Sequence, residues 1–200
     1  MFGWFKKRPP LSPERIFTSR RALLAHLEPL LARTGRTQVL VCAFELSLST
    51  LAAELSRPCV RPKSGAELAR HLQKPESLLA TTTGSVEELQ WPPGAAPADF
   101  LVLERHPLRR HDESLEEVVR AVPGCSVTFL LSLDDPFFTR LGGDRLKQLC
   151  ERLGVGDEPL EHAFITQSVR KAQDKLAKSV RSERPARSAE EWYAANGLHL

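Results

Sequence analysis

Short apolar runs alternate along the chain with stretches whose apolar residues recur every three or four positions. In residues 38–44 every position after Gln38 is apolar, which is typical of a strand buried on both faces of a parallel sheet. Residues 77–81, 100–103 and 127–131 predict three further strands, and residues 59–61 a weaker one. Because helical patterns separate these runs, we expect an α/β fold, a parallel sheet with helices on both faces.

Helix-start signals place the predicted helices. Thr18 or Ser19 can cap the first helix, although Pro29 would shorten or kink it. The segment Ser64-Gly-Ala-Glu67 is a capping-box pattern that opens a helix to about residue 73. The remaining predictions in this part of the chain are helices at 47–55 and 112–121 and a loop at 84–98, which contains Pro92-Pro93-Gly94.

The last third of the chain is predicted to be mostly helical. Residues 144–153 read as a short helix ended by Gly154, since glycine is favoured just after a helix C-terminus. Residues 163–181 have apolar side chains at helical spacing and a basic outer face. That face carries Arg170, Lys171, Lys175 and Lys178, which either bind a partner or are simply solvated. Residues 182–200 are either flexible or dock the aromatic pair Trp192-Tyr193.

Composition limits the classes of protein to consider. The 200 residues are 42% hydrophobic and 26% charged, as in globular proteins, and the net charge of +3 gives no reason to expect nucleic acid as a partner. Four cysteines without CxxC spacing indicate free thiols in a reducing cytoplasm. No segment approaches the roughly 18 apolar residues of a membrane span. Residues 1–8, aromatic and basic, are either disordered or touch the inner membrane peripherally.

Familiar catalytic and metal-binding motifs are absent from the sequence. It contains no GxxxxGKS/T phosphate loop, no GxGxxG and no HExxH, and its histidines do not pair at metal-ligand spacing, so we expect no metal. The chemistry that stands out is a charged cluster after the third strong strand, made of Glu104, Arg105, His106, Arg109, Arg110 and Asp112. Its arginines either grip a phosphate or carboxylate group or form an ion-pair network that fixes the loop.

This cluster carries a family resemblance. The run from Glu104 to Asp112 resembles the ERHESRRID segment of the SecA family of bacterial protein-export ATPases. Residues 129–135, FLLSLDD, are similar to that family's FYLSLEDD, and residues 142–154, 158–162 and 165–175 resemble the segments that follow it, in the same order. The resemblance covers roughly residues 14–181 and is pattern-level before residue 104.

The resemblance implies a three-layer RecA-like fold of the P-loop NTPase type, equivalent to the second motor domain of SecA, over residues 14–141. Residues 142–181 would then correspond to the start of the family's helical scaffold. Residues 1–13 would be a flexible N-terminal segment and residues 182–200 a C-terminal tail. The first motor domain, with its phosphate loop and catalytic carboxylate, would be missing.

The departures from the family bear on activity. In SecA the segment after ERHESRRID supplies arginines that meet the ATP phosphates. Here residues 113–124 place Glu116 at the first arginine position, and only Arg120 remains nearby, out of register. A glutamate there would repel the charge that develops on the γ-phosphate. The preceding nucleotide motif survives at residues 81–85 without its arginine and aspartate. We therefore expect no enzyme activity, no cofactor, and ATP binding only weakly or in a composite site.

Three functions remain open. The first is a non-enzymatic module that binds a protein partner such as SecA, the translocon or an export cargo, through the cluster and the basic helix face. The second is a half-ATPase that completes a composite nucleotide site with a subunit bearing a phosphate loop, using Arg105, Arg109, Arg110 or Arg120. The third is a helicase-like nucleic-acid binder, which the balanced charge and the lack of interleaved aromatic residues disfavour.

Overall fold

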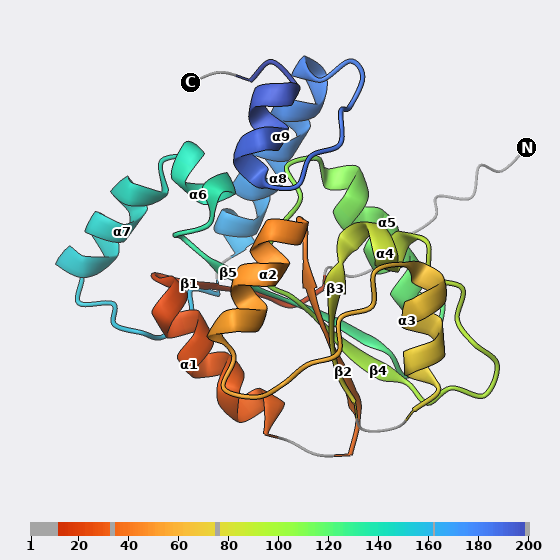
Figure 1. Cartoon of the computed structure of the whole chain (residues 1–200). Helices are drawn as coiled ribbons and strands as arrows, with labels where there is room; N and C mark the ends of the chain where they lie inside the picture. The colour runs from red at the N-terminus through yellow and green to blue at the C-terminus, as the bar shows by residue number, and fades with distance from the viewer. Residues whose placement is uncertain (1–11, 33–34, 75–76, 162, 199–200) are drawn as a thin grey trace, which may run out of the picture.

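A computed structural model describes residues 12–32, 35–74, 77–161 and 163–198 (Figure 1). Its centre is a five-stranded, all-parallel sheet with the strand order β1-β5-β4-β2-β3. The strands are β1 (Glu14–Phe17), β2 (Thr37–Cys42), β3 (Leu78–Thr82), β4 (Ala98–Val102) and β5 (Ser126–Ser132). The predicted α/β class is confirmed, and the arrangement is that of a RecA-like three-layer fold.

Helices cover both faces of this sheet (Figure 1). One face is covered by α1 (Arg20–Leu31) and α2 (Glu45–Glu54). The other is covered by α3 (Gly65–Leu72), α4 (Thr83–Glu87), α5 (Arg109–Arg120) and α8 (Ala163–Ser179). The remaining helices, α6 (Pro136–Arg140), α7 (Gly143–Arg152) and α9 (Ala189–Ala195), lie beyond the carboxyl ends of the strands.

The continuous apolar run in β2 follows from this layering. Successive side chains of a strand point to opposite faces of the sheet. Val39 and Val41 belong to the core under α3, α5 and α8, whereas Leu40 and Cys42 belong to the core under α1 and α2. A strand with helices on both sides therefore needs apolar residues at every position.

The two edge strands each carry a short additional contact. Val60 bridges β3, where its amide donates to Leu78 O at 3.0 Å and its carbonyl accepts from Ala80 N at 2.8 Å. The weak strand predicted at 59–61 is therefore a single-residue bridge. At the opposite edge, Ile16 of β1 pairs with Leu160 through bonds of 3.2 and 2.8 Å.

The helix-start signals are largely confirmed. Ser19 caps α1, which continues through Pro29, and Ser64 caps α3 by accepting from the amide of Glu67 at 3.3 Å. The carboxylate of Glu67 in turn accepts a hydrogen bond from the amide of Lys63. Gly154 follows α7 with a φ of +69°, which glycine adopts without strain.

Two boundaries in the middle of the chain were predicted wrongly. The loop predicted at 84–98 begins with the helix α4, which runs to Glu87. The helix predicted from Asp112 begins one turn earlier, at Arg109, directly after Pro107-Leu108. As a result, Arg109 and Arg110 lie in the first turn of α5 rather than in a preceding loop.

The C-terminal third packs against the rest of the molecule. Val169 of α8 is 3% exposed and belongs to the same core as the sheet, and Trp192 and Tyr193 of α9 are 1% and 2% exposed. Of the two alternatives for residues 182–200, the described part, to Leu198, docks its aromatic residues. The membrane contact predicted at residues 1–8 lies outside the described residues, as does the flexible segment predicted at 1–13 except for Ser12 and Pro13, which accept hydrogen bonds from Arg120 and Phe129. Within the described ranges, no helix is long and apolar enough to cross a membrane.

Candidate functional site

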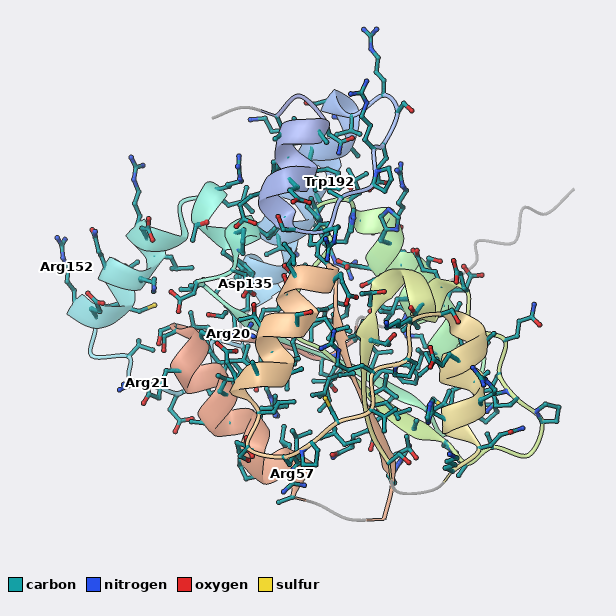
Figure 2. The ribbon with its side chains drawn as sticks, viewed as in Figure 1. Arg20, Arg21, Arg57, Asp135, Arg152 and Trp192 are labelled. Carbon is teal, nitrogen blue, oxygen red and sulfur yellow. The ribbon has the colours of Figure 1, made fainter. Side chains whose placement is uncertain are left out.

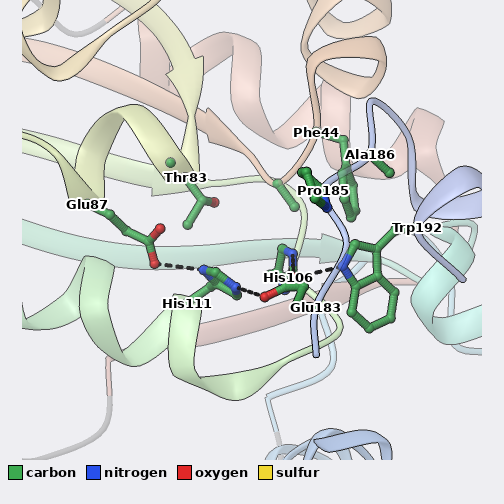
Figure 3. Close-up of a pocket in the computed structure, with 11 residues that line it drawn as sticks. Phe44, Thr83, Glu87, His106, His111, Glu183, Pro185, Ala186 and Trp192 are labelled. Atoms are coloured by element: carbon green, nitrogen blue, oxygen red, sulfur yellow. Dashed lines mark hydrogen bonds and ion pairs between the residues drawn. The ribbon is translucent and has the colours of Figure 1, made fainter. Parts of the chain in front are cut away.

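The candidate site lies at the carboxyl ends of the strands, where ligands bind in open α/β sheets. A pocket of about 280 Å³ opens there between Phe44 after β2, Thr83 after β3 and His106 after β4 (Figure 3). A second pocket of about 420 Å³ lies beside it, against Glu104 and Asp135. The predicted charged cluster therefore borders both pockets.

Arg105 is enclosed in a buried ion network. Its guanidinium donates to Asp112 Oδ2 at 2.6 Å and to Glu14 Oε2 at 2.9 Å, and it stacks over the Phe129 ring at 4.1 Å. The three charged side chains are only 4%, 6% and 4% exposed. Of the two roles considered for this arginine, gripping a ligand and fixing the loop, its geometry is that of the second.

Gln173 joins this network to α8. Its amide donates to Asp112 Oδ2 at 2.8 Å and to the His106 carbonyl at 2.9 Å, and the side chain is fully buried. Arg105 Nε, Glu14 Oε1 and Gln173 Oε1 are buried without a hydrogen-bond partner, so the network is only partly satisfied, but its bonds connect side chains from four elements. The network therefore ties β1, β4, α5 and α8 together.

Glu104 faces the opposite side of the strand end. Its carboxylate accepts from the amides of Ala43 and Phe44 at 3.0 and 3.2 Å and from Ser47 Oγ at 2.8 Å. Burial raises its pKa to about 7, and these three hydrogen bonds only partly oppose the rise. Glu104 thus fixes the start of α2 against the end of β4.

Asp135 is the second buried carboxyl group of the larger pocket, near Arg20 of α1 (Figure 2). Its side chain accepts from the amide of Ser132 at 3.0 Å. Burial raises its pKa to about 8, and the negative charge of Glu104 adds to the rise. Because Asp134 also lines this pocket, its wall is rich in carboxyl groups.

In the smaller pocket, Glu183 is a hub for donors from three segments (Figure 3). Its carboxylate accepts from Trp192 Nε1 at 2.7 Å, from His111 Nε2 at 2.8 Å and from Arg110, and His106 Nε2 lies 3.3 Å away. Burial opposes its charge, but the bonds from His111, Trp192 and Arg110 outweigh burial and lower its pKa to about 2.

The two histidines of this pocket differ in protonation. His111 Nδ1 bonds Glu87 at 2.8 Å while Nε2 bonds Glu183, so both ring nitrogens act as donors and the ring is charged. Burial opposes that charge, but the two carboxylates outweigh it and raise the His111 pKa. Burial and the neighbouring His111 lower the His106 pKa to about 3.

A metal ion does not suit this histidine pair as it stands. Ligand atoms of His106, His111 and Glu183 lie within 4.8 Å of one another, which is close enough for a shared ion. However, His106 Nδ1 accepts a bond from the Leu108 amide at 3.1 Å, so the proton of the neutral ring sits on Nε2, the nitrogen that would have to bind the metal. The charged His111 presents N–H groups as well.

The remaining candidate arginines, two in the cluster and Arg120 beyond it, are paired with carboxylates of the same chain. Arg109 contacts Glu113 at 2.7 Å and Asp174 at 3.5 Å, and Arg110 contacts Glu183. Arg120 donates to Glu116 at 3.2 Å and to Ser12 Oγ at 2.8 Å.

The basic face predicted on α8 is only partly an outer face. Lys171, Lys175 and Lys178 are exposed, but Arg170 is half-buried. The Nε of Arg170 is buried without a partner, and burial together with Arg109 and Arg105 lowers its pKa. Arg170 therefore turns toward the body of the protein, and three lysines make up the solvent-facing surface.

Several site residues escaped prediction from the sequence. Glu87 and Glu183 were not singled out, Trp192 was named only as one of an aromatic pair that could dock, and His111 lay within the 104–112 run without a role of its own. One overlooked signal is Ser188-Ala-Glu-Glu191, a capping box: Ser188 Oγ accepts from the Glu191 amide at 3.2 Å and starts α9. That pattern predicts a helix that presents Trp192 and Tyr193.

Comparison with known proteins supports the family resemblance over part of the chain. No family model matches the sequence. The chain is 45% identical over 80 residues to the protein translocase subunit SecA of Sorangium cellulosum, 38% of this chain and 8% of that protein. The SecA subunits of Treponema denticola and Polaromonas sp. are 41% and 40% identical over 76 and 80 residues. The chain thus contains a SecA-related stretch that spans less than a tenth of these relatives.

Proposed function

We propose that this chain is a SecA-type second motor domain that does not hydrolyse ATP and instead serves as a protein-binding or regulatory module in protein export. The link to export rests on the SecA-related stretch and on the RecA-like sheet. The absence of hydrolysis rests on the chemistry of the strand-end site.

The observation that carries the proposal is the pairing of the arginines at residues 105, 109, 110 and 120 with carboxylates of the same chain. An arginine stabilises a phosphoryl group by directing its N–H groups at the phosphate oxygens. Here those N–H groups are directed at Asp112, Glu113, Glu183 and Glu116 instead. A nucleotide would have to displace a carboxylate at each position.

The charge of the two pockets supports the same conclusion. The larger pocket is lined by Glu104, Asp134 and Asp135, and the smaller by Glu87 and Glu183. Ionised carboxylates repel a triphosphate unless a cation lies between them, and a carboxyl group that keeps its proton, as a pKa of about 8 implies for Asp135, offers no positive charge to hold it. The strand ends, where a RecA-like fold would hold phosphate, are therefore poorly suited to ATP on this chain alone.

A surface suited to a protein partner lies on α8. Lys171, Lys175 and Lys178 are exposed along one helix, and such a row of ammonium groups favours an acidic protein surface. SecA itself, the translocon and an export cargo are the partner classes to test. Residues 104–112 contribute through the side chains that reach solvent, chiefly Arg110.

Nucleotide titration tests the loss of ATP chemistry. Calorimetry with ATP and Mg²⁺ is performed on the chain alone and on the chain mixed with purified SecA. We expect no nucleotide-dependent heat beyond that of SecA itself. A composite site in trans would instead give new binding or hydrolysis that Arg109→Ala or Arg110→Ala abolishes, and would overturn the proposal.

Charge reversal tests the partner surface. The triple variant K171E/K175E/K178E is compared with R21E/R145E/R152E, which makes the same charge change at exposed positions on other helices. Both proteins are used to capture SecA and translocon subunits from bacterial extract. We expect the α8 variant alone to lose the Sec component. Recovery of no Sec component by the unmodified chain would contradict the link to export.

A further inference from the structure

Residues 182–198, here called the C-terminal strap, run across the carboxyl ends of the strands. They contribute Glu183, Pro185 and Trp192 to the smaller pocket, and Ser188 and Glu190 to the larger one. In Figure 1 the strap and its helix α9 lie above the strand ends. The strap is thus the wall shared by the two pockets, and it covers the surface that parallel α/β sheets use for binding.

An apolar cup in the body of the protein receives the strap. Trp192 and Tyr193 are buried against Phe44 and Leu108, and the Trp192 ring meets His106 edge-on at 5.5 Å. The Tyr193 ring lies under the Arg140 guanidinium at 4.0 Å. Aromatic side chains with one polar atom in a cup of this kind are typical anchors of protein–protein interfaces.

Polar contacts hold the strap through few points. The Glu183 carboxylate accepts hydrogen bonds from Arg110 and His111 of α5. The Leu46 amide of α2 donates to the Arg187 carbonyl of the strap at 3.0 Å. No described residue of the strap forms part of the sheet. Besides this main-chain bond to α2, the strap is held to the folded body mainly by side-chain contacts, including that of Arg140 with the Leu198 carbonyl at 3.4 Å, and it can leave without breaking a strand pairing.

We propose that the strap is a releasable cover, and that the surface beneath it binds a partner segment with an acidic residue followed by an aromatic one. The apolar cup of Phe44 and Leu108 suits the aromatic ring. Arg110 and His111 suit the carboxylate. The inference rests on the proposed function only in that the partner is a protein, and its test needs no export component.

The test uses a fluorescent peptide with the sequence of residues 182–198 as the probe. It is titrated into the full chain and into the full-chain double variant E183A/W192A, whose own strap lacks both anchors. The tethered strap competes at the high effective concentration of a short linker. We expect the peptide to bind the double variant at least about tenfold more tightly than the unmodified chain.

Matched controls separate displacement from general loosening. A peptide carrying Glu183→Ala and Trp192→Ala should not bind either protein. Trp91→Ala removes a partly buried tryptophan that packs on Phe100, away from the strap, and should leave peptide binding as in the unmodified chain. A folded double variant that fails to bind the peptide, or that binds it no better than the Trp91→Ala protein, overturns the proposal.

Hydrogen exchange on the unmodified chain gives an independent readout that does not depend on the variants folding. The amides of Trp192, Asn196 and Leu198 are hydrogen-bonded within the strap. A releasable cover exposes them in local openings, so they should exchange well before the amides of β2, β4 and β5. Exchange of strap and sheet in one cooperative step would show that the strap is an inseparable part of the fold.

Discussion

Arg105 and His106 are neighbours in the chain, yet they belong to ion networks of different kinds. Arg105 points into the molecule, where its guanidinium donates to Asp112 and Glu14. Gln173 donates to the same Asp112 carboxylate. His106 points to the smaller pocket, where Glu183 arrives from the strap. The first network joins elements that make up the core, and the second joins the core to a segment laid over it.

The difference shows how one strand end can serve two purposes. A charge pair sealed from water is costly to break because each partner left alone stays unsolvated. A pair at the rim regains water when it separates, so its loss costs less. The Arg105 network is therefore a fixed part of the fold, whereas the Glu183 network can open without loss of the fold.

Breaking the enclosed network should give the largest effect. Arg105→Met leaves Asp112 and Glu14 buried without their cation, and we expect the free energy of unfolding to fall by about 3–5 kcal/mol. Urea denaturation followed by circular dichroism measures it. A loss below about 1 kcal/mol would mean that Arg105 contributes no more than a surface ion pair.

The buried carboxyl group of Asp135 should make stability depend on pH. Its pKa is raised from 3.8 to about 8, so the folded protein keeps a proton that the unfolded chain releases in that interval. This contribution is fully present below pH 3.8 and is lost as the pH rises through about 8. Asp135→Asn keeps an oxygen acceptor for the Ser132 amide and cannot ionise. The variant should lose less stability than the unmodified chain between about pH 5 and about pH 9, and an unchanged slope would refute this.

The network around Glu183 should make the attachment of the strap depend on pH without changing the stability of the rest of the fold. The His111 pKa is raised, so its contribution is complete below its ordinary value of 6.5 and is lost as the pH rises through its folded value. The charged groups facing it are Glu87, Glu183 and Arg110, and the neutral His106 ring lies 4.0 Å from its ring. We expect the protection factor of the Trp192 indole N–H, the exchange rate of a free indole divided by its own NMR exchange rate at the same pH, to fall above that pH. His111→Gln should remove the pH dependence of this protection factor, and a variant that keeps it would assign the effect to another group.

The smallest effect is expected at the surface pairs. Arg109→Ala removes contacts to Glu113 and Asp174, which are each 55% exposed. Solvent screens such pairs, so the free energy of unfolding should change by less than about 1 kcal/mol. Urea denaturation beside Arg105→Met provides the direct comparison. A change as large as that of Arg105→Met would remove the distinction between enclosed and surface charges.

The sheet could be predicted from the sequence because its strands carry strong local signals. The apolar run at 38–44 and the capping residues Ser19 and Ser64 need little outside context. The short helices were harder to predict from the sequence. Helix α6 has its start signal in Asp135-Pro136, with proline at the first helical position, and α4 has only five residues.

The site was less predictable because it depends on distant pairs. The cluster at 104–112 was found from its charges, but nothing local reveals that Arg105 turns inward and His106 outward. Glu183 reaches Arg110 across 73 positions of the chain. Arg170 was assigned to the outer face by helical spacing alone, although the packing of α8 against α5 brings it inward.

The bridges at the two sheet edges limit how any partner can attach. An unprotected edge strand offers free amides and carbonyls to an incoming chain, which can extend the sheet or start aggregation. Here Val60 occupies part of the β3 edge and Leu160 part of the β1 edge. These contacts obstruct the addition of a strand at both edges of the sheet. A protein partner is therefore expected to bind the helices or the carboxyl ends of the strands.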